Sequence, residues 1–170
     1  MKIGRRVTAA MAGVLAAPLI VVALPSGTAF AHGYVNSPPS RQAQCAAGTV
    51  ACGNIKYEPQ SVEGPKGLQS CHANLSQFAD LSDESKKWNV AKTGTKVKFN
   101  WTFTARHKTR DYDYYVDGRK VATIDGKNQM PGSVVSHEVT VGAGRHKVLA
   151  VWNIADTAMA FYSCIDVQAS

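Results

Sequence analysis

Beyond Ala31 the sequence contains no apolar run long enough to cross a membrane. It has no internal repeat and no low-complexity tail. No C-x2-C pair occurs, and the irregular cysteine spacings argue against a zinc site. A motif with the paired carboxylates of a glycoside hydrolase cleft is also missing. These absences disfavour an integral membrane protein, a repeat array and a sugar hydrolase.

The start of the chain, from Met1 to Ala31, fits a secretory signal. A positively charged start precedes the segment 7–24, which is largely apolar and uncharged, and Ala29 and Ala31 complete an A-x-A-like cleavage site. A membrane anchor is the alternative, because the run is nearly long enough to span, but two prolines interrupt or end it. We expect a signal peptide over 1–31 and a secreted, extracellular chain that begins at His32.

Cleavage would leave one domain, 32–170, which is long enough for a single hydrophobic core but not for two ordinary domains. Three of the 19 basic residues and none of the 12 acidic residues leave with the signal, so the net charge falls from +7 to +4. Such a mild excess does not argue for a nucleic-acid partner. We expect a monomer with no nucleic-acid partner and no membrane attachment after processing.

All four cysteines follow the signal, which fits an oxidising compartment and two disulfides. Four thiols allow three pairings. Cys45 with Cys52 would close a short local loop, which leaves Cys71 with Cys164. The second bridge would tie an early loop to the last strand.

The sequence from about residue 97 predicts antiparallel strands. In "KVKFNWTFTA" every second residue is apolar, which indicates a strand with one wet face. Asp117-Gly118 predicts a hairpin turn, and Asp125-Gly126 is a second turn signal. Three further alternating stretches follow, and Trp152 continues an apolar strand face that we expect in the core. Short strands at this spacing are typical of an all-β, antiparallel β-sandwich.

The segment from Gly33 to about Lys92 has little periodicity. It is rich in Pro, Gly, Ser and Gln, and only residues 74–81 suggest a short helix. Connections this long in compact domains are usually functional or disordered. Because two predicted disulfides anchor the segment, we expect an ordered, functional loop region.

An N-terminal histidine offers a metal two nitrogens, and an internal histidine offers one. After cleavage, the α-amine and ring Nδ1 of His32 can close a chelate, and a second imidazole completes a T of three nitrogens. Such a nitrogen set suits Cu(II). The sequence leaves the second ligand open among the remaining histidines: His72, His107, His137 and His146.

Each of these histidines also has a structural explanation. His137 shares a strand face with valines, which is typical of a packed or half-buried histidine. His146 lies between two basic residues and is expected at the surface, and His72 adjoins a predicted disulfide cysteine. His107 follows the long alternating strand, where a side chain can turn back over the end of a sheet.

Four blocks of the mature chain, in the same order, resemble the bacterial chitin-active lytic polysaccharide monooxygenases. They are "HGYVNSPPSRQAQC", "CGNIKYEPQSVEGPKG", "TARH" and "AVWNIADTAMAFY". The resemblance covers the whole mature chain. It implies a fibronectin-like or immunoglobulin-like sandwich that holds one copper ion, as Cu(II) or Cu(I), on a flat surface in a brace of two histidines.

Carried over by position, the resemblance makes His32 and His107 the copper ligands. Phe161 takes the place of an axial aromatic and cannot ligate, so it leaves that side of the metal apolar. Ala105 matches the small residue that crowds the open side of the copper. Glu63 matches the acid that positions the oxygen species by a hydrogen bond.

The resemblance also suggests a substrate face. Tyr57 matches an exposed aromatic on which a pyranose can stack, and Glu58, Asp156 and Thr157 are weaker candidates for the same face. Met159 departs from the family, because a polar asparagine is common there. This change leaves the brace intact and affects only the substrate face or the reach of the copper pocket.

The implied activity is oxidative cleavage of the β-1,4 bonds of crystalline chitin at C1. An external electron donor would reduce the copper, and O2 or H2O2 would serve as the oxidant. A flat site suits a flat crystal. One alternative is a noncatalytic chitin-binding module, which needs no free amine at His32. Another is a periplasmic-type copper carrier, which has no use for the block "YEPQSVEG".

Overall fold

The computed structural model describes residues 31–170. The expected signal peptide therefore lies outside the described residues, except for Ala31. Within the described range no helix is long and apolar enough to cross a membrane. The elements in chain order are β1 (His32–Ser37), α1 (Arg41–Ala46), a 3₁₀-helix (Asn54–Lys56), β2 (Glu63–Pro65), a second 3₁₀-helix (Ser76–Ser82), β3 (Ala91–Thr93), β4 (Lys96–Ala105), β5 (Thr109–Val116), β6 (Arg119–Gln129), β7 (Val134–Thr140), β8 (Gly144–Ile154) and β9 (Met159–Ala169).

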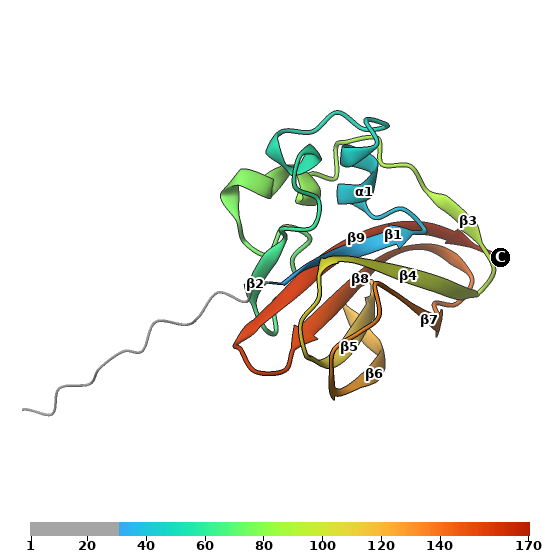
Figure 1. The fold of residues 1–170 in the computed structure, drawn as a ribbon. Coiled ribbons are helices and arrows are strands. Elements are labelled where there is room, and N and C mark those ends of the chain that lie inside the picture. The colour runs from blue at the N-terminus through green and yellow to red at the C-terminus, as the bar shows by residue number, and fades with distance from the viewer. Residues whose placement is uncertain (1–30) are drawn as a thin grey trace, which may run out of the picture.

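The strands form two sheets that pack face to face, which confirms the predicted sandwich (Figure 1). One sheet has the order β1-β4-β7, and the other has the order β2-β9-β8-β5-β6, with β3 paired in parallel to β9. The predicted alternation of β4 places Phe99, Trp101 and Phe103 in the core between the sheets. The Phe103 and Trp152 rings meet edge to face, 4.6 Å apart, across this core.

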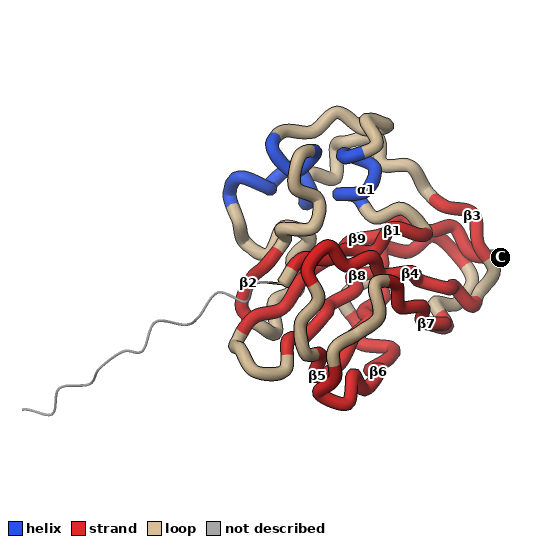
Figure 2. Tube along the Cα trace, in the orientation of Figure 1, coloured by secondary structure: helices blue, strands red, loops and turns tan. Residues whose placement is uncertain are grey.

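The loop region, residues 38–90, covers the outer face of the larger sheet (Figure 2). Alternate residues of β9 face in opposite directions, so Phe161 lies in the sandwich core and Tyr162 lies beneath the loops. The loop region therefore has its own apolar cluster, which includes Ile55 and Phe78, rather than lying loosely on the surface.

Both predicted disulfides are present. Cys45 and Cys52 close the local loop, and Cys71 is bonded to Cys164 in β9. The short helix expected at 74–81 is the second 3₁₀-helix, Ser76–Ser82, with a kink at Phe78. The helix α1 was not predicted, because it is too short to show a period. Its N-terminus is capped by Ser40, whose side chain accepts a hydrogen bond from the Ala43 amide.

The turn prediction was correct at one of its two positions. Asp117 and Gly118 join β5 to β6, and both have positive φ, 48° and 84°. The turn expected at Asp125-Gly126 was wrong, because β6 continues to Gln129. Gly126 instead allows close backbone approach, since a Cβ there would lie 2.4 Å from the Thr109 side chain.

A buried arginine fastens the loop region to the larger sheet. Arg41 in α1 is fully buried, and its guanidinium donates two hydrogen bonds to Asp166 in β9. It also donates two to Glu84 and one to the carbonyl of Leu81. The pair with Arg41 lowers the pKa of Glu84 to about 2, with a smaller contribution from Lys147. One side chain thus connects a helix, a loop and a strand.

We expect Arg41→Met to destabilise the protein by about 3 kcal/mol, because Asp166 would remain buried without its ion partner. Urea denaturation measures the free energy of unfolding. Arg145→Met is the matched control, since Arg145 is exposed on β8. A loss below about 1 kcal/mol for Arg41→Met, as for an exposed pair, would contradict this role.

Candidate functional site

The two histidines of the expected brace lie at the same end of the sandwich. His32 begins β1, where it is paired with Ala105, the last residue of β4. Residues 106–108 then cross from the smaller sheet to the larger one, where Thr109 begins β5 opposite Ile154. His107 lies in this crossover. Ala105, expected near the metal, is therefore directly across from His32.

A glycine is required immediately after His32. A Cβ on Gly33 would lie 2.6 Å from the Phe103 ring and 3.1 Å from the Thr102 carbonyl. The Gly33 amide donates to the carbonyl of Gln60, so the loop region also fixes the start of β1. The backbone beside His32 is thus held from both sides.

An aromatic ring lies beside His32 on the core side. The centroids of the His32 and Phe161 rings are 6.4 Å apart, and Phe161 in turn packs against Trp152 at 5.1 Å. Phe161 is 1% exposed and carries no metal-binding atom. Glu63 begins β2 and is paired with Phe161, so it lies at the same end of the larger sheet. The structure therefore brings together His32, Ala105, Phe161 and Glu63.

His107 is held by a carboxylate. Its Nε2 lies 2.7 Å from Oδ1 of Asp156, in the turn between β8 and β9, and the imidazole is 27% exposed. This hydrogen bond is the largest contribution that lowers the pKa of Asp156 below its usual value. Asp156, a weak candidate from the sequence, is thus a direct partner of the expected ligand.

Two of the other histidines, His137 and His146, lie away from this end of the sandwich. His137 is paired with Phe99 in the middle of β4 and shares one hydrogen bond with the Tyr114 hydroxyl at 2.8 Å; burial lowers its pKa to about 4. His146, opposite Val167, lies at the far end of β8 and is bonded to Asp117, with a side chain only 17% exposed. It is thus more buried than expected.

The turn that carries Asp156 and Thr157 is supported by a lysine. Lys66 Nζ donates to the carbonyl of Thr157, and the Lys66 amide donates to the carbonyl of Ala158. Desolvation, and next the nearby charge of Arg110, lower the pKa of Lys66. This role of Lys66 was not predicted, and no local signal in the sequence could have revealed it.

Tyr57 presents an exposed aromatic ring. It is 77% exposed, as the resemblance implies. Tyr57 follows the 3₁₀-helix Asn54–Lys56, and the Lys56 ammonium lies 4.8 Å from the centre of its ring. Glu58, the next residue, is half-buried. The contact from Lys56 was not predicted.

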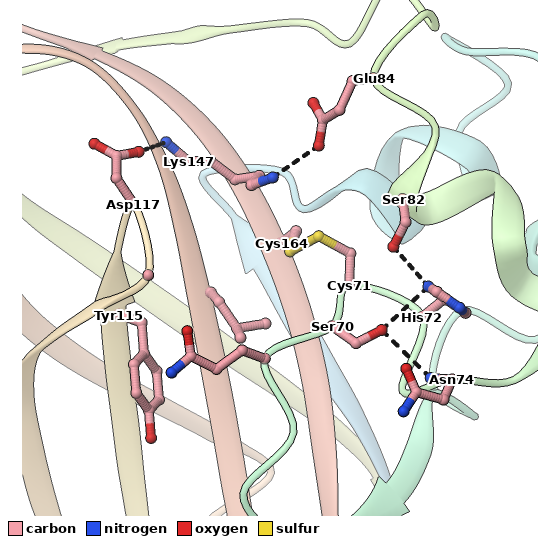
Figure 3. A pocket seen from close by; sticks show the side chains of 13 residues that line it. Ser70, Cys71, His72, Asn74, Ser82, Glu84, Tyr115, Asp117, Lys147 and Cys164 are labelled. Atoms are coloured by element: carbon pink, nitrogen blue, oxygen red, sulfur yellow. Dashed lines mark hydrogen bonds and ion pairs between the residues drawn. A yellow bond between two sulfur atoms is a disulfide. The ribbon is translucent and has the colours of Figure 1, made fainter.

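A hollow of about 640 Å³ lies away from this end of the sandwich, between the loop region and the outer face of the larger sheet (Figure 3). His72 lines it, bonded to Ser70 and Ser82, and the Cys71–Cys164 disulfide forms part of its wall. None of its lining residues belongs to the group around His32 and His107. We therefore place the candidate site on the surface at the end of the sandwich rather than in this hollow.

Comparison with known proteins identifies the family. A family model described as lytic polysaccharide mono-oxygenase, cellulose-degrading, matches residues 32–167. The chain belongs to the lytic polysaccharide monooxygenases. It is therefore an oxidoreductase, and its immunoglobulin-like sandwich is the fold of this family.

Individual relatives agree with this assignment. A lytic chitin monooxygenase from Streptomyces ambofaciens is 56% identical, over 99% of this chain and 98% of that protein. A lytic polysaccharide monooxygenase from Jonesia denitrificans matches with a TM-score of 0.80 and 45% identity, over 82% of this chain and all of that one. A Bacillus amyloliquefaciens CBM33 protein, whose structure is a complex with Cu(I), matches with a TM-score of 0.61 and 26% identity, over 82% and 100%.

The donor set at this end of the monooxygenase fits copper. Within residues 31–170 no group of three or more His, Cys, Asp or Glu side chains is placed to hold a metal. A brace needs only two such side chains, because its third nitrogen is an α-amine. In the described chain Ala31 precedes His32, so the His32 nitrogen is part of a peptide bond. The third nitrogen requires cleavage at this bond.

We expect His107→Ala to raise the pKa of Asp156 towards its usual value in the metal-free monooxygenase, because the hydrogen bond with His107 is the main contribution that lowers it. Carboxyl NMR titration measures this pKa. Asp83 is the control, since its lowered pKa depends on Ser85 and must not change. An unchanged pKa of Asp156 would show that the two side chains do not interact in solution.

Proposed function

We propose that this monooxygenase is exported, is cleaved after Ala31, and oxidises crystalline chitin with one copper ion. The observation that carries the proposal is the pairing of His32 with Ala105. Ala105 precedes His107 by two residues, so this pairing brings the expected N-terminal residue to the strand end from which His107 follows. The signal pattern over 1–31 supports export. The name of the Streptomyces relative supports chitin.

The copper ligands in this proposal are the α-amine and ring of His32 and the ring of His107. Bound copper would supply one-electron redox chemistry, with electrons from an external donor and O2 or H2O2 as oxidant, for attack at C1 of the sugar. Phe161 offers no donor atom, so it keeps one side of the site apolar. Ala105 limits the space beside His32, and Glu63 orients the oxidant by a hydrogen bond.

The substrate face consists of residues that surround this end of the sandwich. Tyr57 offers its exposed ring for stacking on a pyranose. Glu58, Asp156 and Thr157 offer polar groups for the hydroxyl and acetamido groups of chitin. Asp156 has two roles here, because its carboxylate holds His107 and is 53% exposed towards solvent. The face is built on a turn, a short helix and a strand end that are all tied to the larger sheet.

The comparisons name two polymers. The family model is described as cellulose-degrading, whereas the relative at 56% identity is described as a chitin monooxygenase. We favour chitin, because that relative matches nearly the whole chain rather than a general family pattern. Incubation with β-chitin or with cellulose, followed by mass spectrometry of the soluble products, separates the two substrates. Oxidised cello-oligosaccharides alone would overturn the choice of chitin.

We predict that the chain beginning at His32 binds Cu(II) about a hundredfold more tightly than the chain that retains Ala31, or about 2.8 kcal/mol. The physical reason is that the peptide bond removes the free amine and with it the chelate. Calorimetric titration of both chains measures the affinities. His146→Ala is the matched histidine control, and its affinity should be that of the parent. Equal affinities with and without Ala31 would exclude the brace.

A further prediction separates an enzyme from a binding module. His107→Ala should abolish oxidised chito-oligosaccharides but retain chitin binding, because it removes a copper ligand and leaves the stacking ring. Tyr57→Ala should weaken chitin binding severalfold and retain copper, because it removes stacking area but none of the proposed metal ligands. Pull-down with β-chitin and product mass spectrometry measure both effects.

The two variants also show how this proposal would fail. If His107→Ala released oxidised products at the rate of the parent protein, with copper and reductant present, the oxidation would not depend on the brace. The noncatalytic chitin-binding module would then be the better explanation. Lys147→Ala is a control for surface changes, because Lys147 lies on β8 towards the far end of the sandwich.

A further inference from the structure

Two methionines lie within the described residues, in contrasting places. Met159 is the first residue of β9, half-buried and paired with Pro65 of β2. Met130 lies between β6 and β7 and is 56% exposed. Met130 lines a separate hollow of about 190 Å³ together with Val135 and His137. In the sequence Met159 stands where the family commonly has an asparagine, and the proposed activity assigns no role to its side chain.

The strand alternation places Met159 at the candidate site. Odd-numbered residues of β9 face the sandwich core, so Met159 lies on the same side as Phe161, about 7 Å further towards the end of the strand. The Phe161 ring is the one that lies beside His32. Met159 is thus the next side chain after Phe161 at the open end of the sandwich.

The segment that precedes Met159 in the chain is bonded to His107, the second expected ligand. Asp156, three residues before Met159, holds Nε2 of His107. The Met159 amide donates to the Thr157 hydroxyl at 3.1 Å, and the pairing with Pro65 fixes the same backbone from β2. Along the chain, Met159 therefore lies between Asp156, which is bonded to His107, and Phe161, which lies beside His32. Its backbone is held in place by these hydrogen bonds.

The geometry points to Met159 as an oxidation site of the copper centre, a thioether that intercepts oxidant which finds no polysaccharide. This inference rests on the proposed function. The reaction is a two-electron oxygen transfer from H2O2: the O–O bond breaks, one oxygen bonds to the Met159 sulfur, and the other leaves as water. Sulfur is oxidised to the sulfoxide and peroxide is reduced to water, so the step consumes no electrons from the reductant, which would serve only to keep the copper reduced.

The chain supplies its own control, because Met130 is the more exposed thioether. Without copper, H2O2 from solution should oxidise Met130 faster than Met159, since such oxidation follows exposure. With copper and reductant the order should reverse, and Met159 should become sulfoxide about tenfold faster than Met130. Added β-chitin should slow the reaction at Met159 and leave Met130 unchanged. Peptide mass spectrometry quantifies both sulfoxides in the chain that begins at His32.

Conservative variants test the consequence. Met159→Leu keeps the volume and removes the sulfur, and Met130→Leu does the same at the control position. We expect Met159→Leu to bind copper with the parent affinity. In the absence of chitin it should accumulate oxidised His32 and His107 peptides at least about twofold faster than Met130→Leu, because the competing thioether is gone.

The outcomes separate this inference from the proposed function. If the copper-loaded protein releases oxidised chito-oligosaccharides but Met130 remains the faster site, the inference on Met159 is wrong and the proposed function stands. If no oxidised oligosaccharides are released and copper leaves the methionine ratio of the metal-free protein unchanged, the proposed function itself fails. Reversal of the ratio together with its suppression by chitin supports both.

Discussion

The last strand, β9, is buried on both faces, and the rest of the structure depends on this. One face closes the core of the sandwich, and the other is covered by the loop region. A strand that is apolar on both sides cannot be left open to water, so the irregular first half of the chain must fold against it. The Cys71–Cys164 bridge and the Arg41–Asp166 ion pair fix this cover in place. Because Phe161 and Met159 lie at the end of the same strand, the packing of β9 determines where the candidate site lies.

The residues of the candidate site lie at one end of the sandwich, and none of them lines the hollow of about 640 Å³. The components of the site come from the start of β1, the crossover after β4, the turn before β9 and the loops around Tyr57 and Glu63. Each of these segments is anchored to a sheet, so the packing of the sandwich sets the relative positions of the site residues. The proposed function requires this end of the molecule to meet a polymer, rather than to enclose a small molecule as a concave site does.

Local patterns in the sequence predicted those parts of the fold that depend on short-range interactions. The alternation of β4, the Asp117-Gly118 hairpin and both disulfide pairs were correct, because each follows from short-range pattern or from simple elimination. The pairing of β1 with β4 and the parallel pairing of β3 with β9 could not be predicted. They join segments that are far apart in the chain, and no periodicity encodes such contacts.

The site shows the same limit. His32 was predicted as a ligand from the cleavage pattern, but the residues alone left four histidines open as its partner. The choice depends on which strand ends meet at one end of the sandwich, and only the fold or a family resemblance supplies that. The contact between His107 and Asp156 joins positions 49 apart in the chain and has no signature in the sequence. Gly126 was misread for a related reason, because glycine serves close approach as readily as a turn.

Tyr57 is exposed at its ring and fixed at its backbone. Its amide donates to the carbonyl of Asn54, and the amide of Gly53 at the start of the same turn donates to Asp80 at 2.7 Å. Asp80 is itself paired with Lys86, and Cys52 just before the turn is bridged to Cys45. When a flat apolar surface packs on this ring, only the rotation of the Tyr57 side chain is restricted. Little conformational entropy is lost on contact, because folding has already removed the freedom of the backbone.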